Sequence, residues 1–203
     1  MKSKFLLLSP RFISAVAASA LLSATVFAQA PATPAPKAAA PAATPPATPA
    51  EKPKPLQNVD DTYVKAATKS MNYLIQLSNA AKTGLSDANL VRFRDTTAKD
   101  MATTLAQLTK IAEAHGTKLA IDVVGTDKVD LERLAKVKPD KFPKDWVEAV
   151  FKEAKRLDHE TEVIAKTAQD PELKTFLPNY TPMIHNVFST AEAAQKTLKA
   201  AKK

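Results

Sequence analysis

The chain has 203 residues, a formal net charge of +8 and no cysteine. This length suits one ordinary domain with additional segments. The lack of cysteine excludes disulfide scaffolds, thiolate metal sites, cysteine nucleophiles and lipid attachment through an N-terminal cysteine. With three scattered glycines and three histidines, the sequence also excludes a glycine-rich phosphate loop and offers little material for imidazole chemistry.

Residues 1–28 have the pattern of an export signal peptide. Lys2, Lys4 and Arg11 supply a positive start, residues 12–26 carry no charge, and the residues ending at Ala28 fit a signal-peptidase site. The apolar run is shorter than the roughly 20 residues that a membrane span needs, so an uncleaved anchor is the weaker alternative. We expect cleavage after Ala28, a periplasmic location, no lipid anchor and no later membrane span.

Residues 29–57 form a segment of mostly alanine, proline and threonine, and nine of the 15 prolines lie between Pro31 and Pro55. Such a composition buries too little apolar area to offset the entropy of ordering, so it predicts a disordered, extended linker. The linker is either a spacer or a tail without a role. The remaining part, residues 58–203, is close to neutral, which argues against nucleic-acid binding.

Residues 58–203 are predicted to form a helical domain, because apolar residues recur at intervals of three and four. We expect Asp60 or Asp61 to cap the first helix and Gly84 to end it. A second helix runs from Ser86 or Asp87 to Gly116, and a short helix capped by Thr126 or Asp127 follows. The third long helix begins near Pro143, and the last begins at Asp170-Pro171.

Four apolar stripes predict an all-α, antiparallel four-helix bundle with a short extra helix between helices two and three. We expect Leu119, Ile121 and Val124 to pack against the bundle, and Pro178 and Pro182 to kink or divide the last helix. The stripes comprise Val64, Ala67, Met71, Leu74 and Ala81; Val91, Arg94, Ala98, Met101, Leu105, Leu108 and Ala112; Val147, Val150, Ala154, Leu157, Thr161, Ile164 and Ala168; and Tyr180, Ile184, Val187, Ala191, Ala194 and Leu198.

Several short motifs carry a family resemblance over about residues 60–198: Tyr63-Val64-Lys65-Ala66-Ala67, Leu157-Asp158-His159, Asp170-Pro171-Glu172-Leu173, and Leu177-Pro178 ahead of His185. Together they resemble the bacterial exported family called domain of unknown function 4142. The resemblance implies a ferritin-like fold and export, but no reaction. Asp100-Met101 stands where the family usually has Asp-His, and Met71-Asn72 where a glutamate is usual. Both departures remove potential metal ligands.

The histidines decide which metal chemistry the sequence permits. No acidic residue has a histidine three positions later, so the paired Glu-x-x-His motifs of a di-iron centre cannot be built. Asp158, His159 and Glu162 share one helical face, and with His185 from the last helix they are the candidate ligands of a single metal ion. The alternative places His159 on a solvated ion-pair face and makes His185 a half-buried packing residue.

The sequence therefore predicts an exported, non-enzymatic periplasmic bundle with a binding or structural role in the cell envelope or in stress. It predicts no catalytic residue and no cofactor. The alternative is a metal-binding, ferritin-like protein with a degenerate single-metal site. We also expect an unidentified envelope partner, and weak contact with anionic surfaces through Lys196, Lys199, Lys202 and Lys203. The other interpretation of these lysines is that they complement a helix dipole.

Overall fold

The computed structural model describes residues 54–201, which contain five helices and no strand. The helices are α1 (Asn58–Ala80), α2 (Ala88–Ala114), α3 (Thr126–Leu134), α4 (Phe142–Thr167) and α5 (Pro171–Ala200). The all-α prediction is confirmed, including a short helix between the second and third long ones. The predicted signal peptide, and the predicted linker up to residue 53, lie outside the described residues. Within residues 54–201, no helix has the length and apolarity needed to cross a bilayer.

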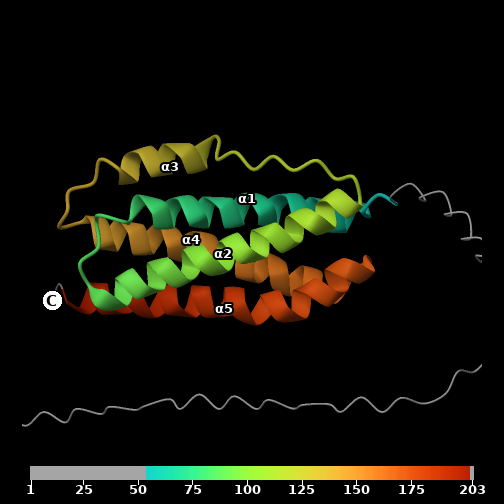
Figure 1. Cartoon of the computed structure of the whole chain (residues 1–203). Helices are drawn as coiled ribbons and strands as arrows, with labels where there is room; N and C mark the ends of the chain where they lie inside the picture. Colours follow the sequence, from blue (N-terminus) through green and yellow to red (C-terminus); the bar gives the residue numbers. More distant parts are fainter. Residues whose placement is uncertain (1–53, 202–203) are drawn as a thin grey trace, which may run out of the picture. The chain divides into compact units, whose positions relative to one another are not determined.

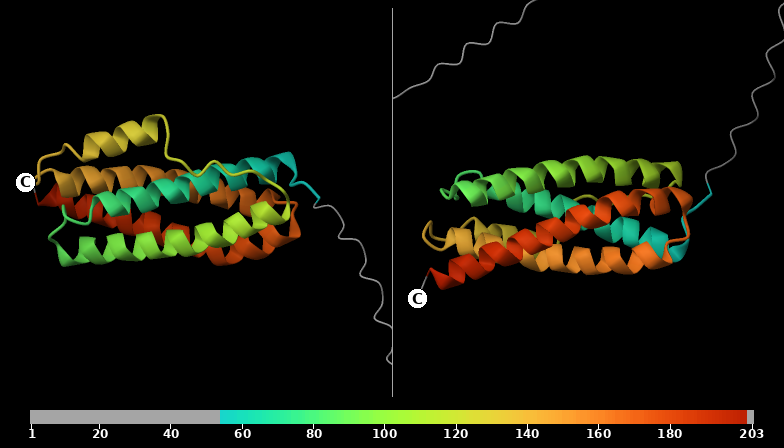
Figure 2. Two further views of the ribbon diagram at one scale, coloured as in Figure 1. Left: turned by 45° about the horizontal axis from the view of Figure 1, so that its top comes forward. Right: turned by 90° about the horizontal axis from the view of Figure 1, so that it is seen from below.

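The long helices pack as two hairpins laid against each other, as Figures 1 and 2 show from three directions. One hairpin is α1 with α2, and the other is α4 with α5. Across the hairpins, α1 contacts α4 and α2 contacts α5. The short helix α3 lies outside this helical bundle, against α1 and α4. It therefore adds a wall to one side of α4 that the long helices alone would leave open.

The core follows the predicted stripes most closely in α1 and α4. Every stripe residue of α1 is buried, and so is every stripe residue of α4 from Val147 to Ala168. Met101 of α2, which the sequence places in the core, is fully buried too. Burying a side chain the size of methionine contributes about 1.5–3 kcal/mol, so the larger residues of these stripes are a main source of stability.

The stripe predicted for α2 is confirmed in part: Met101, Leu108 and Ala112 are buried, but the buried face of the first half of the helix is displaced by about one residue. Val91, Arg94, Ala98 and Leu105 are only half-buried, whereas Leu90, Phe93, Thr97 and Thr104 are buried. Phe93 packs edge-on against the fully buried Trp146, with ring centroids 5.7 Å apart. Arg94 lies at the border, where its guanidinium donates to the carbonyls of Ala81 and Lys82 after the end of α1. This rotation of α2 buries the ring of Phe93 and places Arg94 where it caps the end of α1.

The N-terminal cap predicted for the first helix is wrong, and the acidic residue concerned has another role. Helix α1 begins at Asn58 after Gln57, which makes no side-chain cap. Asp60 is fully buried, and its carboxylate accepts hydrogen bonds from the backbone N–H groups of Gln169 and Asp170, at 3.0 and 2.8 Å. Asp60 therefore fastens the start of α1 to the turn between α4 and α5.

Gly116 ends α2 as predicted, but the prediction that Gly84 ends the first helix is wrong, because α1 ends at Ala80 with Ala81 as its C-cap. Gly116 has a φ of 68° and lies one residue beyond the end cap of α2, where the N–H of Thr117 reaches back to the carbonyl of Ala112 at 2.8 Å. This is the left-handed terminator that the sequence predicts. Gly84 has no such conformation. A Cβ there would lie 2.5 Å from the ring of Phe142, so close packing against α4 requires the glycine.

Three smaller expectations are also corrected. Gly125, with a φ of 63°, precedes α3 in place of a capping Thr126 or Asp127. Leu119 packs on the core as predicted, but Ile121 and Val124 are exposed, and Val123 packs on the core in their place. Pro178 and Pro182 do not divide the last helix: α5 is continuous across both. Each proline is exposed, so the carbonyl left without its helical donor lies on the solvated side of α5.

Candidate metal centre

Three of the four predicted ligands come together between α4 and α5. Asp158 and Glu162 lie one turn apart on α4, and His185 faces them from α5. One ligand atom from each residue lies within 4.8 Å of the other two. In residues 54–201 no other group of three or more aspartate, glutamate and histidine side chains meets this condition.

Asp158 is the buried member of the group. It is 7% exposed, and its Oδ2 lies 3.3 Å from Nδ1 of His185. Its second oxygen, Oδ1, is buried and has no hydrogen-bond partner in the described part of the chain. A buried carboxylate oxygen without a donor is costly, because the charge has lost water and gained nothing in exchange. The geometry therefore leaves one coordination position of Asp158 unused.

The positions of these residues follow from the apolar stripes. Leu157 and Thr161 belong to the buried stripe of α4, and Asp158 borders it on the side of α5. On α5, His185 follows the fully buried Ile184 and points outward enough to leave 60% of its side chain exposed. Glu162 is exposed as well. The group thus has one buried ligand, Asp158, and two ligands exposed to water, Glu162 and His185.

Phenols lie on the inner side of the group. Tyr180 is 2% exposed, and its hydroxyl has no partner within the described residues. Burial raises the pKa of Tyr180 well above its usual range, and the nearby Tyr63 and the Asp158 carboxylate raise it further. Tyr63 shares a hydrogen bond of 3.1 Å with Thr161. These phenols therefore stay neutral and close the inner side with polar but uncharged groups.

The fourth predicted ligand, His159, does not join the group. It is exposed and lies with Tyr63 and Val163 along a groove between α1 and α4. Its neighbour Asp158 faces α5, so these two adjacent residues of α4 lie on different faces of the helix. The expectation that His185 is half-buried is wrong, since most of its side chain is exposed, although it does contact a neighbouring helix.

The predicted lysine cluster is described only in part. Lys196 pairs with Glu192 at 3.0 Å, and Lys199 donates to Gln195 at 3.0 Å, both one turn back on α5. Lys202 and Lys203 lie outside the described residues. Local partners thus occupy both described lysines.

A second histidine–carboxylate pair was not predicted. His115, at the end of α2, has Nε2 3.1 Å from Asp170 Oδ2 and Nδ1 2.7 Å from the carbonyl of Lys54. The contact with Asp170 is close, but its geometry is not that of a hydrogen bond. No local motif points to this pair, because its members are far apart in the sequence.

Comparisons with known proteins give a family and a fold. The family model for Domain of unknown function (DUF4142) matches residues 45–194. Among solved structures, the crystal structure of a DUF305 fragment from Deinococcus radiodurans is similar, with a TM-score of 0.62 and 8% sequence identity. The similarity covers 70% of this chain and 99% of that chain, and at this identity it concerns the fold alone. A comparison with curated proteins finds no match.

Proposed function

The chain belongs to the DUF4142 family, and we propose that it is an exported, non-enzymatic helical bundle that binds one divalent transition-metal ion between α4 and α5. One observation carries this proposal. Asp158, whose Oδ1 is buried and unpartnered, lies in a group whose other members, Glu162 and His185, are within reach of a common ion. We also propose that the long helices have a ferritin-like arrangement.

The donor set defines which ions fit. Two carboxylate oxygens and one imidazole nitrogen are typical ligands for zinc, manganese, iron(II), cobalt and nickel, whereas calcium and magnesium favour oxygen alone. The two carboxylates balance the charge of a divalent ion. Because Glu162 and His185 are exposed, water completes the coordination and the ion exchanges readily with solution.

Binding without catalysis agrees with the surroundings of the group. The buried side is lined by the neutral phenol of Tyr180 and the hydroxyl of Thr161, and neither is prepared as a base or a nucleophile. A metal ion held at the surface by three side chains suits buffering, delivery or sensing. The unidentified partner in the cell envelope remains part of the proposal.

Metal binding is tested on full-length protein purified without chelator. We expect about one zinc ion per chain on titration, and a loss of affinity of about tenfold or more in Asp158→Asn and His185→Ala. His159→Ala is the matched control, because it removes a neighbouring histidine that faces another groove. Equal loss in the control, or unchanged affinity in Asp158→Asn, would overturn the site.

Export is tested separately. We expect the protein in the periplasmic fraction, with an intact mass that begins at Gln29. A mass that retains residues 1–28, found in the inner-membrane fraction, would contradict export by a cleaved signal.

A further inference from the structure

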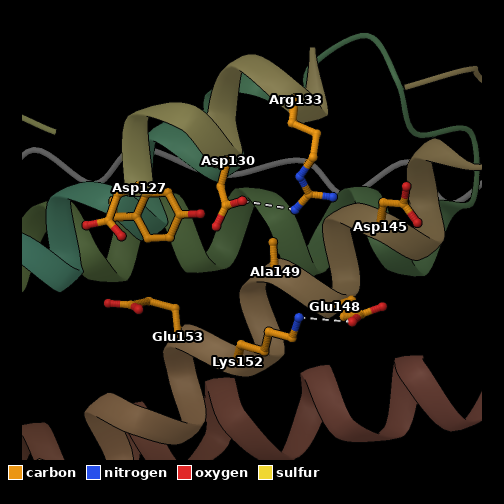
Figure 3. A pocket seen from close by; sticks show the side chains of 9 residues that line it. Asp127, Asp130, Arg133, Asp145, Glu148, Ala149, Lys152 and Glu153 are labelled. Atoms are coloured by element: carbon orange, nitrogen blue, oxygen red, sulfur yellow. Dashed lines mark hydrogen bonds and ion pairs between the residues drawn. The ribbon is translucent and has the colours of Figure 1, made fainter. Parts of the chain in front are cut away.

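A second pocket lies where α3 packs against α4, away from the metal group. Asp127, Asp130 and Arg133 of α3 face Asp145, Glu148 and Glu153 of α4 (Figure 3). These side chains line a cavity of about 160 Å³. The spacing of three along α3 places its three polar residues on one side. Only Leu134 of α3 is buried, so this helix presents a largely polar face to the bundle.

Carboxylates outnumber cations in the lining. Five acidic side chains line the pocket, against Arg133 and Lys152 as the basic ones. Most of the acids have a partner at the rim, such as Asp130 with Arg133 and Glu148 with Lys152, each at 3.1 Å. Such partly exposed pairs hold each other weakly, so a bound cation can displace them. Asp145 forms no ion pair with any described residue.

The inner wall of the pocket is a phenol without a partner. Tyr73 of α1 lines the cavity, is 4% exposed, and its hydroxyl forms no hydrogen bond within the described part of the chain. Burial raises the pKa of Tyr73 well above its usual range, and the charges of Asp130, Asp127 and Glu153 raise it further. The phenol thus stays neutral and offers its hydroxyl oxygen to a cation.

We propose that this pocket binds a short aliphatic diamine. The carboxylates line opposite walls and do not converge as metal ligands do, since the one convergent group in residues 54–201 is Asp158, Glu162 and His185. Two ammonium groups separated by methylenes match separated carboxylates, and Ala149 with the Tyr73 ring offers an apolar surface between them. A cavity of this size holds about five or six non-hydrogen groups, which is the size of 1,4-diaminobutane.

Equilibrium dialysis of the full-length protein with labelled 1,4-diaminobutane tests the proposal. We expect saturable binding. Butylamine, which has one charge, and magnesium, which has two charges but no methylene chain, should each compete only weakly. Tyr73→Phe and Asp145→Asn should each weaken binding by about tenfold, because each removes an unpartnered polar group. The control Glu113→Gln removes an exposed carboxylate of α2 that does not line the pocket.

The outcomes separate this pocket from the metal group. Absence of saturable binding at millimolar concentration, or equal competition by magnesium, would overturn the diamine site. So would unchanged binding in Tyr73→Phe, a variant that keeps the buried ring and therefore the fold. Asp158→Asn should leave diamine binding unchanged, so failure of the metal site and failure of this pocket are distinguishable.

Discussion

Two histidine–carboxylate pairs in the same bundle differ in how their carboxylate oxygens are bonded. At one end of the molecule, Asp170 caps α5 by accepting from the N–H of Leu173, and its own N–H donates to Asp60. Its partner His115 is 16% exposed, and both ring nitrogens face oxygen atoms. Between α4 and α5, Asp158 has an oxygen without a partner, and His185 is 60% exposed.

This difference in bonding indicates a structural role for one histidine–carboxylate pair and a ligand-binding role for the other. The pair at the end joins the start of the domain, the end of α2 and the turn before α5. Asp170 and Nδ1 of His115 form hydrogen bonds that hold these segments together, while Nε2 of His115 forms none. The pair between α4 and α5 joins only two neighbouring helices and keeps spare ligand capacity. An unfilled position beside a second carboxylate, Glu162, is what a metal ion requires.

The largest effect is expected at Asp60, which accepts from the N–H of Asp170 at the same end of the molecule. Asp60→Ala should lower the free energy of unfolding by about 3 kcal/mol, because two backbone N–H groups lose a charged, fully buried acceptor. Urea titration measures the change. The control is Asp61→Ala, which removes a half-buried neighbour that bonds Lys65 and Thr117 and should cost much less. Equal losses in the two variants would show that Asp60 does not hold the turn.

Replacement of His115 by alanine tests the same end more gently. We expect a loss of about 2 kcal/mol, since the contact with Asp170 and the hydrogen bond to Lys54 are both removed from a mostly buried position. The loss should be unaffected by zinc or by chelator. A metal-dependent loss would mean that His115, and not His185, is the ligand.

Periodicity predicts most of this fold, because a helix that buries one face repeats its apolar residues every three or four positions. It was least accurate in α2, where two adjacent stripes compete. Arg94 has an apolar stem and fits the predicted stripe, yet its guanidinium caps α1, and Phe93 takes the inner position. Which stripe faces inward depends on contacts with other helices, and the sequence of α2 alone does not contain them.

The candidate metal group was predictable within one helix and less so between helices. A spacing of four places Asp158 and Glu162 on one side of α4, and the structure agrees. The same local argument included His159, which the rotation of the helix turns toward α1. Contacts such as Asp60 with Gln169 join residues 109 positions apart, so only the assembled bundle reveals them. The pocket under α3 is of this kind too.

The start of the domain provides a smaller test. Leu56, inside the predicted linker, is buried at 9% exposure, and the Lys54 carbonyl bonds His115. A chain beginning at Lys54 should therefore be as stable as one beginning at Gln29. One beginning at Asn58 should lose about 2 kcal/mol, chiefly from exposing the core around Leu56. Leu56→Ala in the full chain is the control. Equal urea midpoints for all of these chains would contradict the packing of residues 54–57.

The smallest effect on the metal-free protein is expected at His185. His185→Ala should change the free energy of unfolding by less than about 0.5 kcal/mol, as for any largely exposed side chain with one long hydrogen bond. With zinc the same variant should differ strongly. A ligand at a hundred times its Kd stabilises the folded state by about 2.7 kcal/mol, and the variant should lose most of that gain. His159→Ala should match the unmodified protein in both conditions, because that side chain is exposed on another face. Urea titrations of the two variants and the unmodified protein, each with zinc and with chelator, measure the six values. If His185→Ala destabilises the metal-free protein as much as His115→Ala does, the two pairs are alike and the spare capacity of Asp158 has no functional meaning.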